Sequence, residues 1–331
     1  MHEFFANLPL GGNVFLAVLS LYLLVKSSDW MIEGAVSLAK RLKISPLIIG
    51  ATVVAMGTSM AELAVNLTEI YSGGHTEAIL GNIIGSNFVN LGLGLGMSAL
   101  LSTLITRVAV AEKEIPLHAA ATGLLTAFAV DGVLSHHEGW LMIGSFLIIL
   151  LLIYQYAIRE RTTEAIKEQY YKPQEKIGVK SSCLLTAAGL ILLILAARLL
   201  VETGSNIALA LGVSKYIIGL TIVGIGTSFP EIASSIQAAR KGYTDIVLGN
   251  VFGSNIFNIF FGLGLPMVFR DLMVIEAAFQ DIYFLNVFSL ILIFVLLIEN
   301  KLVGGNKTLD RLGGLLVIMI YFGYLGSKIF G

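Results

Sequence analysis

Long apolar runs separated by short polar connections fill almost the whole chain. A helix needs roughly 20 apolar residues to cross the hydrocarbon core of a bilayer, and ten runs meet that length. The first and sixth runs are longer than a bilayer requires, so we expect those two helices to be tilted. The expected helices lie at about residues 10–40, 45–70, 78–104, 115–134, 138–158, 182–211, 214–239, 245–268, 276–298 and 309–329.

Composition supports a membrane protein made of helices. Of 331 residues, 56% are hydrophobic and 13% are charged, whereas soluble domains carry about 25% charged residues. The net charge of −1 gives no reason to expect nucleic acid as a partner. The single cysteine cannot form an internal disulfide. No basic segment precedes the first apolar run, so we expect a retained helix rather than a cleaved signal peptide.

Basic residues predict the orientation in the membrane. With both termini outside, sixteen of the 21 lysine and arginine residues fall in inside connections and three fall in outside ones. Such an asymmetry favours this orientation, because short cytoplasmic connections are enriched in basic residues. The other two, Lys26 and Arg198, lie within the first and sixth helices, and we expect their side chains to extend toward an interface.

One stretch of the chain occurs twice. Residues 50–69 read GATVVAMGTSMAELAVNLTE and residues 219–236 read GLTIVGIGTSFPEIASSI, at an offset of 169 positions. A second pair, GNIIGSNFVN at 81–90 and GNVFGSNIFN at 249–258, matches at an offset of 168. Each repeat holds five expected helices, and an odd number turns the second copy upside down in the membrane.

The repeat defines the domain organisation. We expect residues 1–158 and 182–331 to form two inverted five-helix repeats, ten transmembrane helices in all, that together make one membrane domain. Residues 159–181 carry six basic side chains and Pro173 and are expected to be a cytoplasmic linker.

Each repeat also places one carboxylate, Glu62 or Glu231, inside an apolar run. An ionisable side chain within the membrane is costly and indicates a functional site, and packing alone gives no reason to keep it twice. A hydroxyl lies four positions before each glutamate, and a serine lies four positions before an asparagine in each second motif, so each pair shares a helix face. These residues are Thr58, Thr227, Ser86, Asn90, Ser254 and Asn258.

Two glycines, Gly57 and Gly226, directly precede the Thr-Ser pairs and allow local unwinding. We expect this unwinding to expose the backbone carbonyls of Ala55 and Gly224, or those of the two threonines. The resulting ligands are all hard oxygen donors, which suit Na⁺, Ca²⁺ or Mg²⁺. Two carboxylates balance one Ca²⁺, and Mg²⁺ is disfavoured because it gives up its water reluctantly.

Other polar residues and glycines receive structural interpretations. The paired glycines of the second motif are expected to allow close helix packing. Glu33 and Glu202 recur in the repeat and either attract cations at an entrance or pair with Lys26 or Arg198. Four histidines near expected helix ends are interpreted as interfacial: His75, His118, His136 and His137.

These motifs resemble the cation/Ca²⁺ exchanger superfamily, specifically its prokaryotic sodium/calcium exchanger branch. The matching stretches are GTSMAE and GSNFVN in the first half, GTSFPE and GSNIFN in the second, and SSDW in the first helix. The resemblance covers essentially the whole chain. It implies antiport of Na⁺ and Ca²⁺ by alternating access in a prokaryotic inner membrane.

The same resemblance implies the roles of individual residues. Glu62 and Glu231 would be shared by Ca²⁺ and Na⁺. Asn90 and Asn258 would contribute amide oxygens. Hydroxyl or carbonyl oxygens would come from Thr58, Ser59, Ser86, Thr227, Ser228 and Ser254. The two ions and the lipid bilayer are the implied partners, and no cofactor or protein partner is implied.

Two departures and several alternatives remain open at this stage. Ala61 stands in place of the usual proline, and Asn258 stands where many relatives have aspartate, which weakens a case for K⁺ co-transport. A Ca²⁺/H⁺ antiporter could use the same glutamates as proton carriers, and a passive cation channel is a third possibility. No nucleophile–base pair is evident, so an enzyme is not expected.

Overall fold

The structure is a computed structural model that describes residues 8–73, 76–106, 114–160, 178–213, 218, 222, 224–302 and 307–330. Helices account for most of it, which confirms the expected all-α membrane class. The first-half helices are α2 (Leu10–Leu42), α3 (Pro46–Ile49), η1 (Gly50–Val54), α4 (Ala55–Thr58), α5 (Met60–Tyr71), α6 (Thr76–Val89), η2 (Asn90–Leu95), α7 (Gly96–Leu101), α9 (Glu114–Ala129) and α10 (His136–Glu160). The second-half helices are α12 (Val179–Ala210), α14 (Gly224–Gly226), α15 (Phe229–Arg240), α16 (Thr244–Phe257), η4 (Asn258–Leu263), α17 (Gly264–Phe269), α18 (Glu276–Leu302) and α19 (Arg311–Phe330).

Six helices in the described part of the chain are long and apolar enough to cross a membrane. They correspond to the first, second, third, fifth, sixth and eighth expected spans. Helices α9, α15, α18 and α19 lie within the remaining ranges. The first half of the seventh range lies mostly outside the described residues, as does most of the linker at 159–181. The count of ten spans therefore remains a prediction.

Burial separates an inner set of helices from an outer set. The apolar windows of α16–η4–α17 and α6–η2–α7, which carry the second repeated motif, are 94% and 78% buried within the protein. Those of α2, α10 and α12 are only 22–28% buried. Large apolar side chains on α10 and α12, such as Leu151 and Leu184, remain exposed. An apolar exterior around a core that contains many polar groups is typical of a protein surrounded by lipid.

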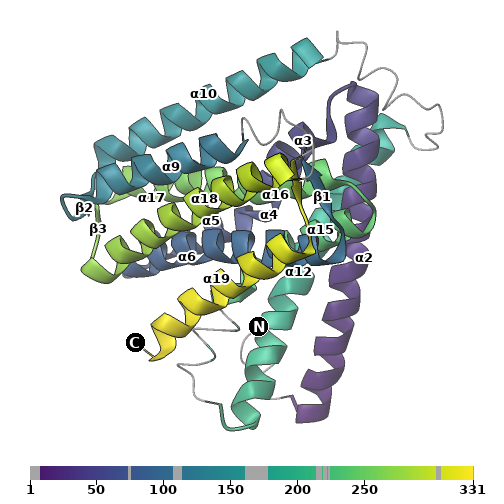
Figure 1. Ribbon diagram of the computed structural model, residues 1–331. Coiled ribbons are helices and arrows are strands. Elements are labelled where there is room, and N and C mark those ends of the chain that lie inside the picture. Colours follow the sequence, from purple (N-terminus) through teal and green to yellow (C-terminus); the bar gives the residue numbers. More distant parts are fainter. Residues whose placement is uncertain are drawn as a thin grey trace.

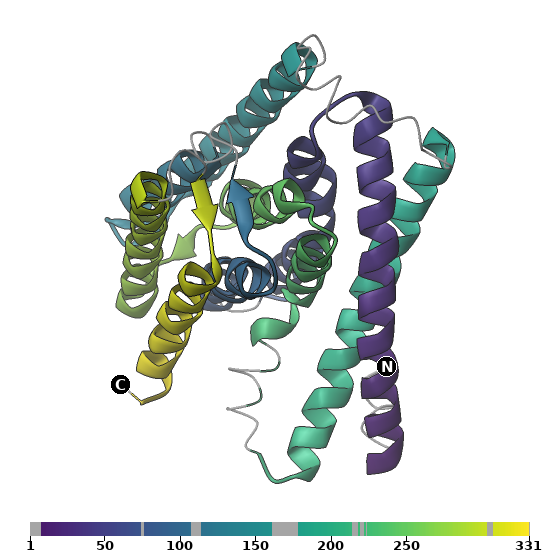
Figure 2. The same cartoon turned by 45° about the vertical axis from the view of Figure 1, so that its right-hand side comes forward.

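The two longest helices, α2 and α12, pack side by side along much of their length (Figures 1 and 2). Small residues allow their backbones to approach closely. A Cβ atom on Gly189 would lie 2.6 Å from the backbone nitrogen of Met31, and one on Gly34 would lie 2.7 Å from that of Thr186. Most of the other helices run across the direction of this pair (Figure 1).

The duplication is visible in the backbone of the turns. Lys43 and Gly212, which are 169 positions apart, both adopt left-handed conformations after the long helices α2 and α12. Gly73 and Gly242, also 169 positions apart, do the same after α5 and α15. Lys43 is the only described non-glycine residue with positive φ. Equivalent positions therefore require the same unusual backbone, as expected if both halves share one fold.

Two short antiparallel ribbons join the halves, which the helical interpretation of the sequence did not anticipate. Strand β1 (Leu104–Thr106) pairs with β4 (Lys307–Leu309), and β2 (Val133–Leu134) pairs with β3 (Leu272–Met273). Each ribbon contains one strand from each half. The strands are too short to have a clear alternating pattern, which explains why the sequence did not indicate them.

The close crossing of α2 and α12 predicts the effect of one added methyl group. Gly189→Ala should lower the free energy of unfolding by about 1–3 kcal/mol, because the new methyl meets backbone atoms that cannot rotate away. Thermal unfolding of the purified protein in detergent measures the change. Gly144→Ala on α10 is the matched control, since a Cβ there has no neighbour within 4 Å. Equal unfolding temperatures for the two variants would contradict the crossing.

Candidate functional site

The two glutamates lie at equivalent breaks in their helices. In the first half α4 ends at Thr58, Ser59 turns with ψ 1°, and α5 begins at Met60. In the second half α14 ends at Gly226 and α15 begins at Phe229. Glu62 and Glu231 are therefore both in the first turn of a new helix. The positive end of the helix dipole stabilises a carboxylate at that position.

The first half has Ala61 where the second half has Pro230, and both halves still show a helix break at this point. The two breaks differ only in length. One residue, Ser59, separates α4 from α5, and the helical bonds from Ser59 N to Ala55 O and from Leu63 N to Ser59 O persist. In the second half, where Pro230 is present, Ser228 N instead donates to Ile225 O, three residues back. The bond that Ser228 N would make to the Gly224 carbonyl is thereby lost. Ala61 thus accompanies a smaller interruption than Pro230.

Each glutamate accepts a hydrogen bond from a serine of the other half. Ser59 Oγ donates to Glu231 Oε1 at 2.9 Å, and Ser228 Oγ donates to Glu62 Oε1 at 3.2 Å. All four side chains are fully buried. Because each serine lies three positions before the glutamate of its own half, the reciprocal bonds place the two carboxylates in one cluster.

Further hydroxyl groups complete the surroundings of Glu62. Ser86 Oγ lies 3.4 Å from Glu62 Oε1 and 3.5 Å from Thr227 Oγ1. Ser254, the counterpart of Ser86, donates instead to the Ala55 carbonyl at 3.4 Å. The structure thus brings Glu62, Ser86, Thr227 and Ser228 directly together, whereas Ser254 reaches the cluster through the backbone.

The carbonyl of Ala55 differs from expectation. It accepts hydrogen bonds from Ser59 N, from Thr58 Oγ1 and from Ser254 Oγ. Local unwinding therefore does not free it, because Ala55 begins α4 and its helical bond from Ser59 N persists. The role of this carbonyl as an ion ligand remains a prediction. Gly57 lies inside α4, where a Cβ would lie 2.5 Å from Leu190 of α12. Because Gly57 has no side chain, the long helix α12 can approach closely at this point. The glycine does not cause the backbone to unwind.

Asparagines of the second repeated motif form another reciprocal network between the halves. Asn87 Nδ2 donates to the Asn255 carbonyl and Asn255 Nδ2 donates to the Asn87 carbonyl, at 3.4 and 3.2 Å. Asn90 Nδ2 then donates to Asn255 Oδ1, and Asn258 Nδ2 donates to Asn87 Oδ1, at 3.0 and 3.2 Å. Asn90 and Asn258 also begin the π-helical segments η2 and η4, and such segments are frequent at functional sites.

Around the glutamates and the asparagine network, the buried polar atoms left without partners are all acceptors. Among the described residues, Glu62 Oε2, Glu231 Oε2, Asn90 Oδ1 and Asn258 Oδ1 are buried and make no hydrogen bond. Asn250 Oδ1, close to the same network, is a further example. Because buried polar groups are rarely left unpaired, a set of oxygens with no donor facing it indicates a site for cations.

Four asparagines were not identified by the sequence interpretation: Asn82, Asn87, Asn250 and Asn255. Asn82 Nδ2 donates to the Glu62 carbonyl and Asn250 Nδ2 to the Glu231 carbonyl, both at 3.2 Å. These equivalent bonds connect the helix that carries each glutamate to the helix that carries the second motif. The sequence did contain an indication of their role, because Asn82 and Asn250 occupy equivalent positions of the second repeated motif, 168 positions apart.

His118 is not interfacial, contrary to the prediction from its position near a helix end. It is fully buried, with Nε2 3.2 Å from Asn255 Nδ2 and Nδ1 3.2 Å from Ser289 Oγ. The Ser289 hydroxyl donates to the Leu285 carbonyl, so it accepts from His118. The Nε2 atom is then free to accept from Asn255, which leaves Asn255 Oδ1 to accept from Asn90. Because Asn90 uses its Nδ2 group to donate to Asn255, its Oδ1 atom faces away from the network.

The paired glycines of the second motif have the expected packing role where their surroundings are described. A Cβ on Gly249 would lie 2.5 Å from the Leu47 carbonyl, and one on Gly253 would lie 2.7 Å from Ala51 Cα. The segment equivalent to Leu47–Ala51 in the second half lies at 216–220, mostly outside the described residues. The same role for Gly81 and Gly85 therefore remains a prediction.

Glu33 forms an ion pair between helices, but not with the predicted partner. Its carboxylate lies 2.8 Å from Lys241 Nζ, at the end of α15, and Lys241 also pairs with Asp29. Gln237 of α15 donates to Asp29 at 2.8 Å. The alternative that Glu33 pairs with Lys26 is wrong, because Lys26 lies two turns before Glu33 on α2, whereas Lys241 directly follows α15, the helix packed against α2.

The charge of the cluster limits what it can bind. No group of three or more His, Cys, Asp or Glu residues is close enough to hold a metal within the described ranges. The two carboxylates must therefore be supplemented by neutral hydroxyl, amide and carbonyl oxygens, which suit Na⁺ and Ca²⁺. A total charge of −2 can be balanced by one divalent or by two monovalent cations.

Comparisons with known proteins find relatives along almost the whole chain. The family profile described as sodium/calcium exchanger protein matches residues 12–155 and 181–330. A protein of Alkalimonas amylolytica named "Putative antiporter CaxA" is 34% identical over 95% of this chain and 97% of its own. The sodium/calcium exchanger MaX1 of Methanosarcina acetivorans is 29% identical over 95% and 97%. The solved sodium-calcium exchanger NCX_Mj, soaked with zero Na⁺ and Ca²⁺, matches with a TM-score of 0.80 and 30% identity over 96% of this chain and 98% of that one.

The role of His118 can be tested by removing its acceptor. His118→Phe should lower the free energy of unfolding by about 1–3 kcal/mol, because an Asn255 N–H loses its acceptor inside the protein. His118→Gln keeps one donor and one acceptor and should recover part of the loss. His137→Phe, at an exposed position, is the control for the chemical change. Thermal unfolding measures all three, and a stable His118→Phe variant would contradict the network.

Proposed function

The chain belongs to the sodium/calcium exchanger protein family, and on this basis we propose that it exchanges Na⁺ for Ca²⁺ across the membrane by alternating access. The observation that carries the proposal is the cluster of buried, unpartnered acceptor oxygens around two carboxylates. Family members are transporters, so the chain acts on ions as cargo rather than as an enzyme.

The two ions compete for the same glutamates. Glu62 and Glu231 supply the charge, and the hydroxyls of Ser59, Ser86 and Ser228 lie against them. Neutral oxygens from Thr58, Thr227, Ser254, Asn90 and Asn258 and from the backbone at Ala55 and Gly224 complete the proposed ligand set. Since Ca²⁺ and Na⁺ cannot occupy the same carboxylates together, binding of one displaces the other. A site neutralised by its ions crosses the apolar barrier more readily than an empty one.

The proposed architecture is ten transmembrane helices in two inverted halves, residues 1–158 and 182–331, with a cytoplasmic linker at 159–181. The matching left-handed turns and the reciprocal hydrogen bonds support the repeat. The gap in the family match between 155 and 181 supports the boundary. The long pair α2 and α12 moves against the other helices to switch access. Both termini lie outside, in a prokaryotic inner membrane.

Coupling to Na⁺ can be tested with labelled Ca²⁺ in proteoliposomes. Uptake should require an outward Na⁺ gradient. Uptake driven by an outward H⁺ gradient and indifferent to Na⁺ would assign a Ca²⁺/H⁺ antiporter that uses the same glutamates. Uptake that dissipates the Ca²⁺ gradient without any counter-ion would assign a channel.

The glutamates can be tested in the same assay. Glu62→Gln and Glu231→Gln should each reduce Na⁺-dependent Ca²⁺ uptake by roughly 100-fold or more, since an interaction with a charged group contributes about 3 kcal/mol. Both proteins should remain folded, because the amide can still accept from serine. Glu77→Gln on the exposed side of α6 should transport normally. Normal exchange by either site variant would place the site elsewhere.

Inverted topology predicts opposite labelling of two equivalent positions. Tyr71 and Arg240 end helices α5 and α15, lie 169 positions apart and are both exposed. With Cys183 replaced by serine, a cysteine at position 71 should react with a membrane-impermeant maleimide on intact cells. A cysteine at position 240 should react only after the membrane is permeabilised. Labelling of both from outside would rule out the inversion.

A further inference from the structure

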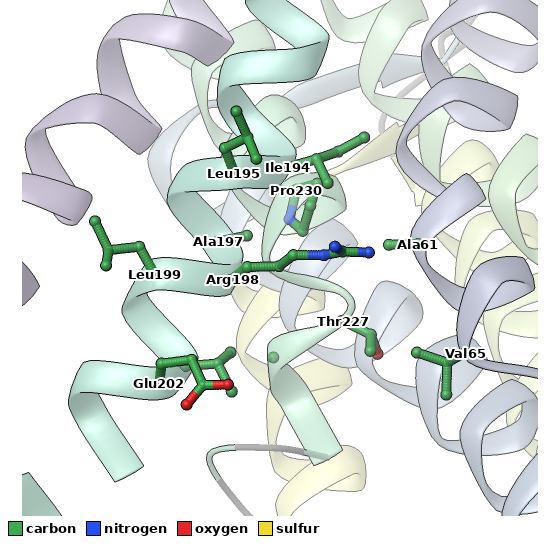
Figure 3. Close-up of a pocket in the computed structure, with 12 residues that line it drawn as sticks. Ala61, Val65, Ile194, Leu195, Ala197, Arg198, Leu199, Glu202, Thr227 and Pro230 are labelled. Atoms are coloured by element: carbon green, nitrogen blue, oxygen red, sulfur yellow. The ribbon is translucent and has the colours of Figure 1, made fainter. Parts of the chain in front are cut away.

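The long helices α2 and α12 contact the glutamate-bearing helices differently at equivalent places. A cavity of about 570 Å³ lies between α12 and the helices α5, α14 and α15, and Thr227 lines it (Figure 3). Val65 of α5 also lines the cavity and is 37% exposed, whereas its counterpart 169 positions on, Ser234 of α15, is fully buried. Val201 of α12 is half-buried in the cavity wall, whereas its counterpart, Ile32 of α2, is fully buried. The protein is therefore open between α12 and α5 and closed between α2 and α15.

Three charged side chains join α2 to α15 on the closed side. Lys241 Nζ, directly after α15, lies 2.8 Å from Glu33 of α2 and also pairs with Asp29 of α2. Gln237 of α15 donates to Asp29 at 2.8 Å. The side chains of Lys241 and Asp29 are each only 24% exposed, so salt screens their attraction less than it would at an open surface. These contacts connect the pair of long helices directly to a helix that carries a glutamate.

The equivalent positions on the open side do not repeat this arrangement. Four residues take the places of Asp29, Glu33, Gln237 and Lys241 at an offset of 169 positions: Arg198, Glu202, Thr68 and Ser72. Thr68 and Ser72, at the end of α5, are exposed, and their hydroxyls donate to the nearby carbonyls of Ala64 and Glu69. A neutral serine thus stands where the other half has Lys241. The sequence therefore supplies a lysine for closure on one side only.

We infer that Lys241, Asp29 and Glu33 form a latch that holds α2 against α15 and favours the state in which the glutamates are reached from the α5 side. This inference rests on the proposed function, in which α2 and α12 move against the other helices. For access to change sides, α2 must separate from α15, so Lys241 must leave both carboxylates. Under the proposed topology Lys241 lies on the inside, so the latch closes the cytoplasmic entrance. Its contacts exist in only one of the two access states and therefore shift their populations.

The accessibility of two equivalent positions tests the latch. In protein with Cys183 replaced by serine, Val65→Cys reports on the open side and Ser234→Cys on the closed side, through their rates of reaction with a maleimide in detergent. Lys241→Gln should raise the rate at position 234 about three- to tenfold, because a partly exposed charged interaction is lost. It should not raise the rate at position 65. A rise at both positions would mean general loosening and would overturn the inference.

Two further variants separate the ion pair from charge alone and from misfolding. Arg240→Gln removes a positive charge from the adjacent, exposed position and should leave both labelling rates unchanged. Exchange of the charges, with Asp29→Lys and Lys241→Asp together, should return the rate at position 234 to within about twofold of that in protein with the original pair. The same rise in Arg240→Gln as in Lys241→Gln, or no recovery after the exchange, would overturn the latch.

Transport by the unmodified protein tests the function on which the inference rests. Absence of Na⁺-dependent Ca²⁺ uptake in proteoliposomes would overturn the exchanger function, while the labelling rates would still show whether Lys241 holds α2 against α15. Na⁺-dependent uptake together with the expected labelling pattern would support both.

Discussion

Two carboxylates held away from water are the constraint on which the rest of this structure depends. Moving an ion of this size into a low-dielectric interior costs several kcal/mol even after the protein relaxes. The fold reduces the cost by placing Glu62 and Glu231 in the first turns of α5 and α15 and by giving each a serine donor. One oxygen of each carboxylate still has no donor among the described residues. The exchange that we propose would link ion binding to the stability of the core, because bound cations would supply what the protein does not.

The neutral part of the site is oriented by hydrogen bonds that begin far from it. Ser289 and His118 fix the amide of Asn255, and Asn255 fixes that of Asn90. An asparagine can present either an oxygen or an NH₂ group, and only the oxygen attracts a cation. In the proposed site, the buried histidine therefore acts through geometry, with no direct contact to an ion. In the second half, among the residues that the structure describes, Asn258 Nδ2 donates to Asn87 and no histidine occupies the place of His118, so the two halves are not equivalent in this respect.

Sequence predicted the features that depend on local spacing and failed for those that depend on which helix lies opposite. The apolar runs located the helices, and the repeated motifs located both glutamates. No property of one helix, however, indicates that Ser59 faces Glu231 across 172 positions or that Lys241, not Lys26, pairs with Glu33. His118 was misplaced for a related reason. Distance from the end of an apolar run was taken as depth in the membrane, although the neighbouring helices decide where this side chain lies.

The exchange of serine donors between the halves has a consequence for the origin of the protein. A half on its own holds one glutamate and one serine whose acceptor belongs to the other half. A single unduplicated copy would therefore have had an incomplete set of contacts. If the halves are inverted as proposed, an ancestor of half this length needed a second copy of itself inserted in the opposite direction before the gene duplicated. The present chain would preserve that antiparallel dimer as a single polypeptide, and duplication freed each half to change separately, as the unmatched His118 shows.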